Sequence, residues 1–279
     1  MSRKWLFAPL AGIFATSLIA QSPVTAPNGA GHVDSTALHS DSAPVTTSVI
    51  SPRHDALMVA GIIAAMAAVA PFDRRLQHAF QDSSVQQSSA LRHTANVFNT
   101  AGGVGALATS VALYGIGRLS GHDAIGAIGL HATEAIAVGG GTTTLLKIVA
   151  GRQRPYVQSR DADDFAFGRG RNDKYASFPS GHTTAAFAFA SSVSADLRDM
   201  HSGVARIATP VLYGGATLVG LSRMYTNEHW GSDVVLGAGI GTIAGLKTIA
   251  FSRAHPNDWI TRHLLPLHAR VCVQSVLCN

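Results

Sequence analysis

The sequence predicts an all-α protein, a helical bundle of about six core helices with a functional site at the helix ends. Apolar stretches rich in alanine, glycine and leucine dominate the chain from about residue 54, and Pro71 and the Gly102-Gly103 pair interrupt them. No alternating runs of Val, Ile and Thr between turn pairs indicate strands. Hydrophobic residues make up 47% of the 279 residues and charged residues 13%, about half the usual charged share, which favours closely packed helices.

Seven stretches have the composition of helices. They cover residues 55–70, 73–99, 101–118, 122–150, 182–199, 203–222 and 231–251. The second stretch mixes apolar residues with Gln, Ser and Arg, a pattern typical of an amphipathic surface helix rather than a membrane span. The bundle is therefore expected to occupy residues 54–252.

The amino terminus has the pattern of an export signal. Arg3 and Lys4 precede an apolar run that ends near Ala20, and this order predicts a signal peptide over residues 1–20. Cleavage after Ala26 and retention as an uncleaved anchor are the alternatives. Residues 21–53 are rich in Ser, Thr, Pro, Asp and Gly and predict a flexible linker. Export places the protein in the periplasm or cell envelope.

Residues 253–279 form a predicted carboxyl-terminal tail that contains both cysteines, Cys272 and Cys278. In an oxidising compartment the two can close a small disulfide loop, and two unpaired thiols are the alternative. A zinc site is not indicated, because no further Cys or paired His completes four ligands.

Membrane insertion is not decided by the sequence. A span needs about 20 mostly apolar residues, and each candidate helix is marginal by length or carries a polar residue. If an exported chain crossed the membrane with helices 55–70, 101–118 and 122–150, Lys147 would lie on the cytoplasmic side. A peripheral or soluble periplasmic bundle avoids this conflict and is favoured, with a membrane surface as a candidate partner. The net charge of +5 without a dense basic tract argues against a nucleic-acid partner.

Two short segments have the chemistry of an anion site. Lys147, Arg154 and Pro155 form a Lys-x6-Arg-Pro pattern, in which proline ends the helix and turns Arg154 toward the same anion as Lys147. Arginine offers a planar fork for two phosphate oxygens and lysine a compact charge. The second segment, Pro179-Ser180-Gly181-His182, opens a helix. The Ser180 and Gly181 amides are expected to face an oxyanion there. Alone, each segment also fits an ordinary helix end.

A third segment supplies the reactive group. Arg223 follows Ser222, and His229 and Asp233 stand four residues apart. At helical spacing the two share a face, so the carboxylate can accept a proton from one imidazole nitrogen. This contact fixes the tautomer and leaves the other nitrogen as a nucleophile. Together the three segments predict a phosphate site.

The three segments resemble the signature of the type 2 phosphatidic acid phosphatase and vanadium haloperoxidase superfamily, over roughly residues 55–252. The resemblance implies an α-helical bundle and a phosphohistidine intermediate formed without a metal ion or other cofactor. It implies that His229 is the nucleophile, Asp233 its orienting partner and His182 the general acid. The phosphoryl oxygens would be bound by five residues: Lys147, Arg154, Ser180, Gly181 and Arg223.

The resulting hypothesis is a phosphatase of the phosphatase branch, acting on phosphomonoesters, with lipid phosphates favoured over small soluble ones by the apolar chain and the export signal. A vanadate-dependent haloperoxidase and a non-catalytic lipid-phosphate binder are the alternatives. A binder needs only the cations and amides, so His229, Asp233 and His182 argue for catalysis. The motif holds only the phosphate and does not identify the leaving group.

Overall fold

A computed structural model describes residues 49–157, 161–200, 203–255 and 259–264. Within these ranges the chain is helical, and its extended pairing is an isolated bridge between Arg152 and Phe165, so the all-α prediction is confirmed. The predicted signal peptide, most of the linker, Cys272 and Cys278 lie outside the described residues. The principal helices are α2 (Pro52–Val69), α3 (Asp73–Phe80), α4 (Ser83–Gln86), α5 (Ser89–Ala101), α6 (Val104–Ser120), α7 (Asp123–Ala150), α8 (Gly181–Asp199), α9 (Ala205–Tyr225), α10 (Gly231–Ala254) and α11 (Trp259–Leu264).

The prediction of one helix over residues 73–99 is wrong, because this stretch forms α3, α4 and α5. Side chains that compete for backbone amides separate them. The Asp82 carboxylate accepts a hydrogen bond from the Ser84 amide at 2.9 Å, and the Ser88 hydroxyl accepts one from the Leu91 amide at 3.3 Å. Asp and Ser favour such caps over helix interiors. The other predicted helices match observed ones to within a few residues.

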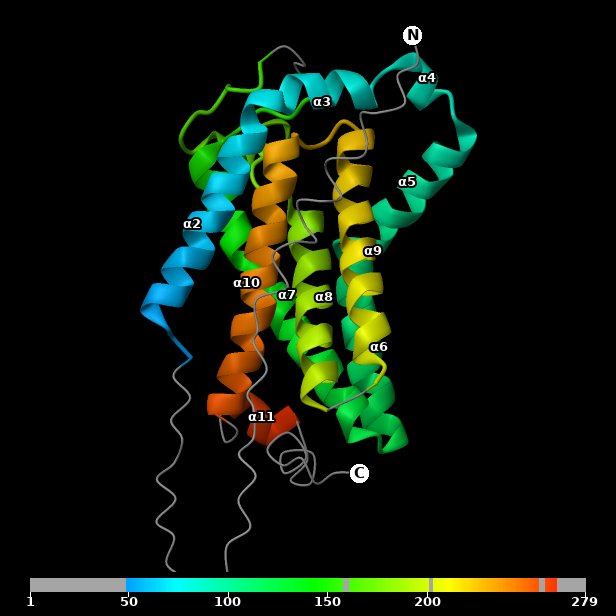
Figure 1. Cartoon of the computed structure of the whole chain (residues 1–279), viewed down its shortest axis with the longest axis vertical. Coiled ribbons are helices and arrows are strands. Elements are labelled where there is room, and N and C mark those ends of the chain that lie inside the picture. Colours follow the sequence, from blue (N-terminus) through cyan, green and yellow to red (C-terminus); the bar gives the residue numbers. More distant parts are fainter. Residues whose placement is uncertain (1–48, 158–160, 201–202, 256–258, 265–279) are drawn as a thin grey trace, which may run out of the picture. The chain divides into compact units, whose positions relative to one another are not determined.

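Helix α8 is the centre of the bundle. It packs against α7, α9 and α10, and Figure 1 shows it between α9 and α10 with α7 behind. Most of its side chains are buried, and most of these are Ala, Ser or Thr. Small side chains let helix axes approach closely, and the hydroxyls of Ser191 and Thr184 bond to the preceding turn, at the Phe187 carbonyl (2.8 Å) and the Ser180 carbonyl (2.9 Å).

A glycine stripe on α10 makes the closest helix contact. At Gly237, Gly241 and Gly245 an added Cβ would collide with atoms of α8, respectively the Ser180 carbonyl, the Thr184 carbonyl and the Ser191 hydroxyl. Residues four apart lie on one helix face, so the stripe forms a groove that receives the α8 backbone. This contact sets how the start of α8 lies against the start of α10.

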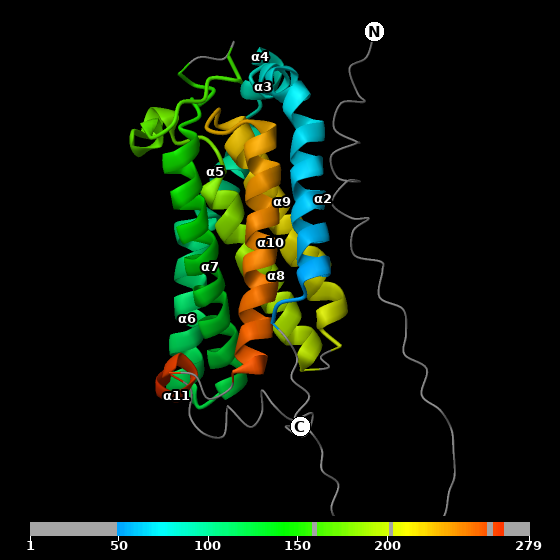
Figure 2. The same cartoon turned by 90° about the vertical axis from the view of Figure 1, so that its left-hand side faces the viewer.

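The functional segments meet at one end of the bundle because neighbouring helices run in opposite directions. Helices α7 and α9 end where α8 and α10 begin, and residues 151–180 and 226–230 connect them there. Helix α3 lies across this end and packs on α9 and α10. Figure 2 shows α10 between α2 and α7, in agreement with the contacts among these helices.

Two helical stretches in the described part of the chain are long and apolar enough to cross a membrane. They are Pro52–Phe80 and Gly231–Ala254, and the pair α5 and α6, bent by 51°, adds a third if it is one span. The first stretch is longer than the predicted helix over residues 55–70, because the 3-10 turn Ala70–Phe72 joins α2 to α3 and the chain stays helical past Pro71. None of the 18 residues of α2 is buried, although its sequence is almost wholly apolar. The unburied apolar surface of α2 indicates membrane association.

The glycine stripe predicts that Gly241→Ala destabilises the fold by about 2 kcal/mol, because overpacking forces α8 and α10 apart. Gly140→Ala is the matched control, since a Cβ there meets nothing within 4 Å. That control should be neutral or more stable by up to about 1 kcal/mol from helix propensity. Denaturant unfolding of both variants measures the difference. Equal effects of the two substitutions would contradict the close contact.

Candidate active site

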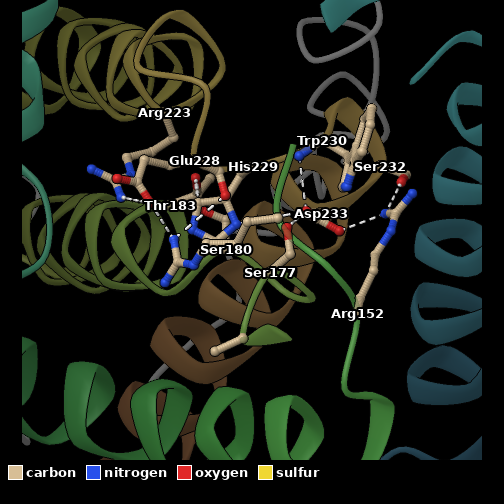
Figure 3. Close-up of polar contacts among 12 residues, drawn as sticks. Arg152, Ser177, Ser180, Thr183, Arg223, Glu228, His229, Trp230, Ser232 and Asp233 are labelled. Carbon is tan, nitrogen blue, oxygen red and sulfur yellow. Dashed lines mark hydrogen bonds and ion pairs between the residues drawn. The ribbon is translucent and has the colours of Figure 1, made fainter. Parts of the chain in front are cut away.

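The structure brings all eight predicted site residues to one end of the bundle. Lys147 lies in the last turn of α7, and Arg223 in the last turn of α9. Ser180 is the N-cap of α8, with Gly181 and His182 in its first turn. Arg154 and His229 lie on the connecting segments, and Asp233 is in the first turn of α10. The sequence segments are thus adjacent in space, and Figure 3 shows Ser180, Arg223, His229 and Asp233 together.

His229 and Asp233 face each other, although not along a helix as predicted. His229 precedes α10, and the chain turns at Trp230 so that the two side chains meet. The His229 Nδ1 lies 3.6 Å from Asp233 Oδ2, and both side chains are buried. Asp233 Oδ2 also accepts hydrogen bonds from the Trp230 amide at 2.8 Å and the Ser177 hydroxyl at 2.5 Å. No described residue bonds to His229 Nδ1.

Burial and positive neighbours keep both histidines neutral. Burial is the main cause that lowers the pKa of His229 to about 3, and the charges of Lys147 and Arg154 add to it. Burial, followed by the charges of Arg223, Lys147 and Arg154, lowers the pKa of His182 to about 4. A neutral imidazole has a free lone pair and can act as a nucleophile.

Lys147 is held against the loop that precedes α8. Its ammonium donates to the Ala176 carbonyl, and burial, followed by the charge of Arg154, lowers its pKa to about 8. Its Cε lies 3.8 Å from where a Cβ of Gly181 would be. This is an ordinary van der Waals distance, so the lysine side chain lies directly beside the start of α8.

The amides at the start of α8 differ from the prediction at Ser180. The Ser180 amide donates to the Asp233 carbonyl at 3.0 Å, and its hydroxyl pairs with the Thr183 hydroxyl at 2.8 Å. The Ser180 amide is thus used to hold α8 against α10. The amides of Gly181 and His182, which follow it, are in the first turn, where no helical partner exists. They carry the positive end of the α8 dipole toward the site.

The most extensively bonded residue of the site, Arg152, was missed from the sequence. Its guanidinium donates to Asp233 Oδ1 at 2.6 Å and to Asp73 Oδ2 at 2.7 Å. It also donates to the Ser232 hydroxyl at 2.7 Å and the Ala162 carbonyl at 2.6 and 2.9 Å.

Three aromatic rings surround this guanidinium. Its central carbon lies 4.9 Å from the ring centre of Phe165, 5.9 Å from Phe178 and 5.5 Å from Trp230. Aromatic faces attract cations, and the planar guanidinium suits such a cage. The position of Arg152, two residues before Arg154, could have signalled its role.

Asp73 is the second residue that sequence reasoning missed. It lies at the start of α3 and is 1% exposed. It accepts hydrogen bonds from the Ser232 amide at 2.8 Å and the Ser232 hydroxyl at 2.5 Å, in addition to Arg152. No local pattern in the sequence identifies it, because its partners lie about 80 and 160 residues away. The α2–α3 corner is thus bonded to the first turn of α10.

The predicted phosphate-binding arginines are already bonded to other side chains. Arg154 donates to Glu228 Oε2 at 2.5 Å and to Asp173 Oδ1 at 2.8 Å. Arg223 donates to the Asn99 amide oxygen and lies 3.6 Å from Glu228 Oε2. Its Nε is buried, with no hydrogen-bond partner among the described residues. Glu228 therefore lies between the two arginine forks.

The α5–α6 junction forms one wall of the site. Gly103 has a φ of +50°, which favours glycine. A Cβ there would lie 3.0 Å from His182 Cδ2 and 3.1 Å from its Nε2. The predicted break at Gly102-Gly103 thus also makes room for the His182 ring. In the described part of the chain, no three His, Cys, Asp or Glu side chains are arranged to hold a metal ion.

Comparison with known proteins gives a family match over part of the chain. Residues 128–256 match the model of the PAP2 superfamily. The superfamily recognised from the three segments is therefore confirmed, although α2 to α6 lie before the matched region.

One protein that is similar in sequence is the lipid A 1-phosphatase of Porphyromonas gingivalis. It is 39% identical over 89 residues, which cover 30% of this chain and 19% of that protein. The match thus spans about a fifth of the relative's length. No solved structure matches the chain.

The Arg152 network predicts that Arg152→Lys lowers the free energy of unfolding by about 3–5 kcal/mol. The three N–H groups of an ammonium cannot replace the five hydrogen bonds that the guanidinium donates, and a weakened buried ion pair leaves uncompensated charge. Arg253→Lys is the control, because Arg253 pairs with Asp199 where both side chains are exposed, and such pairs contribute about 0–1 kcal/mol. Denaturant unfolding compares the variants. A loss below about 1 kcal/mol in Arg152→Lys would contradict the network.

Proposed function

We propose that the protein is a metal-independent phosphatase that hydrolyses phosphomonoesters through a phosphohistidine on His229. The observation that supports this most is the buried, neutral imidazole of His229 next to Asp233 and within the electrostatic field of Lys147 and Arg154. A nucleophile beside cations is what attack on a phosphate requires, because the cations offset the charge of the phosphoryl group.

In the first step, Nε2 of His229 attacks phosphorus while Nδ1 faces Asp233. The P–N bond forms as the bond from phosphorus to the leaving oxygen breaks. Asp233 stabilises the positive charge that develops on the imidazole, since its carboxylate is fixed by Arg152 and Ser177. Lys147 and the two arginine forks bind the phosphoryl oxygens. The Gly181 and His182 amides add hydrogen-bond donors.

In the second step, water attacks the phosphohistidine and releases inorganic phosphate. His182 is the proton carrier for both steps. It donates a proton to the leaving oxygen and then accepts one from the attacking water, as general acid and general base. The pKa of about 4 in the empty site must rise when a phosphate dianion binds, because negative charge favours the imidazolium.

We infer that the substrate is a lipid phosphate. The apolar, unburied surface of α2 and the apolar stretch of α10 suit a protein whose substrate lies in a membrane, and the similar protein of P. gingivalis is named a lipid A 1-phosphatase. The expected setting is the periplasm or cell envelope, with the bundle associated with the membrane. Phosphatidate, other phosphorylated lipids and small phosphomonoesters are the substrates to compare.

A vanadate-dependent haloperoxidase is the second candidate, because vanadate would occupy the same anion site. The apolar helices and the likeness to a lipid phosphatase favour hydrolysis. A non-catalytic binder is disfavoured, since binding alone does not require a neutral histidine paired with a buried carboxylate. Haloperoxidase activity with added vanadate, together with no phosphate release from any substrate, would favour the haloperoxidase over the phosphatase.

The proposed nucleophile predicts that His229→Ala abolishes phosphate release, a loss of at least about 1,000-fold in kcat, because no other group forms the covalent intermediate. Phosphate release is measured on a panel of lipid and soluble phosphomonoesters, with a strong chelator present throughout. His78→Ala on the exposed surface of α3 is the control and should retain wild-type activity. Substantial turnover by His229→Ala, or a strict magnesium requirement in the wild type, would overturn the mechanism.

If His182 is the general acid, kcat and kcat/KM should fall at different pH values as the pH rises. The free-enzyme pKa of His182 is about 4, and bound phosphate raises it. The fall of kcat with rising pH should therefore occur at higher pH than the fall of kcat/KM, because kcat reports the enzyme–substrate complex and kcat/KM the free enzyme. Steady-state kinetics with one aryl phosphate across pH 3–9 measures both limbs. Coincident limbs, or a limb that persists in His182→Ala, would exclude His182 as the acid.

A further inference from the structure

The carboxylate of Glu228 occupies the space between the two arginine forks. Its Oε2 lies 2.5 Å from Arg154 Nη1 and 3.6 Å from Arg223 Nη2. Figure 3 shows Glu228 between Arg223 and His229. One carboxylate oxygen thus takes the position that an oxygen of a bound phosphoryl group would take, beside the residue that attacks phosphorus.

The position of Glu228 affects ligand binding because Arg154 is already hydrogen-bonded through all three of its side-chain nitrogens. Its Nε donates to the Asp173 carbonyl at 2.7 Å and its Nη2 to Asp173 Oδ1 at 2.8 Å. Its Nη1 donates to Glu228, through Oε2 and more weakly through the carbonyl at 3.4 Å. Each nitrogen of the fork therefore has an acceptor, and both contacts of Nη1 are with Glu228, so a ligand oxygen that bonds to Nη1 competes with this residue.

Glu228 is the exposed acceptor that lies beside both arginines. Its side chain is 31% exposed, so it can rotate toward solvent, whereas its backbone is fixed by an amide hydrogen bond to the Arg223 carbonyl at 3.0 Å. The Asp173 side chain is more exposed, at 74%, but it pairs with Arg154, whereas Glu228 also lies 3.6 Å from Arg223. The buried Nε of Arg223, which has no partner among the described residues, gives an incoming anion a further donor. A phosphate dianion offers more oxygens and more charge than the carboxylate it displaces.

We propose that Glu228 is a binding determinant of this site that competes with the phosphoryl group for Arg154 and Arg223 and thereby sets the affinity for phosphate. The proposal rests on the proposed function for its role in catalysis. The expected change in phosphate affinity follows from the geometry alone. Displacement of the carboxylate weakens binding, and the displaced charge remains close and repels the product. Weak binding of inorganic phosphate favours its release after the second step.

The test is direct binding of inorganic phosphate and of orthovanadate, measured by calorimetry on the purified full chain. Glu228→Gln keeps the shape of the side chain and removes its charge. Its Kd for both anions should fall about tenfold relative to wild type, because the competing charge is gone. Asp164→Asn is the control, since Asp164 has a similar exposure of 27%, pairs with Arg169 and contacts neither arginine of the site. Its Kd should change less than about twofold.

Because the readout is binding, it separates this proposal from the proposed function. A wild-type protein that binds phosphate but hydrolyses no phosphomonoester contradicts the function, and the comparison of Kd values still decides the role of Glu228. An unchanged or higher Kd in Glu228→Gln overturns the role of Glu228, whatever the activity. An equal fall in the control variant also overturns it, because the effect would then be one of net charge alone.

Discussion

The arrangement of this site depends on one buried cation, Arg152, which lies between two buried carboxylates. It bonds to Asp233, which faces His229, and to Asp73, which lies at the start of α3. Isolated charges are costly to bury, and here each is compensated by a neighbour with good hydrogen-bond geometry. The guanidinium therefore fixes the α2–α3 corner, the loop after α7 and the first turn of α10 relative to one another, and with them the imidazole that we propose attacks phosphate.

Around this network three cations surround the site, and its two histidines have lowered pKa values that keep their imidazoles neutral. Lys147, Arg154 and Arg223 lower the pKa of His182, while burial lowers those of both His182 and His229. Lys147, Arg154 and Arg223 therefore offer positive charge that a phosphate dianion would satisfy. Until then Glu228 compensates part of that charge. Binding, proton transfer and product release then all depend on how the same few charges are shared.

The sequence predicted the parts of the structure that depend on local chemistry. Helix ends followed from Pro71, the Gly102-Gly103 pair and the three polar segments, and the eight predicted site residues lie at one end of the bundle because those segments are at helix ends. Their roles in phosphate binding and catalysis stay a proposal. The single helix over residues 73–99 was wrong, since the caps at Asp82 and Ser88 outweighed its general composition. Asp73 and Glu228 were missed because their roles come from partners distant in sequence or from competition within the folded site. The signal peptide and the disulfide stay predictions.

The central claim is that phosphate is transferred to His229, and direct detection of that bond tests it most directly. The wild-type protein is quenched during turnover of a phosphomonoester in chelator, digested at alkaline pH, where phosphohistidine survives, and analysed by mass spectrometry. The account predicts one phosphate on the peptide that contains His229, lost on brief acid treatment and absent in Asp233→Asn or at a much lower level. Turnover with no phosphoenzyme under rapid quenching, or phosphate on a different side chain, would contradict it.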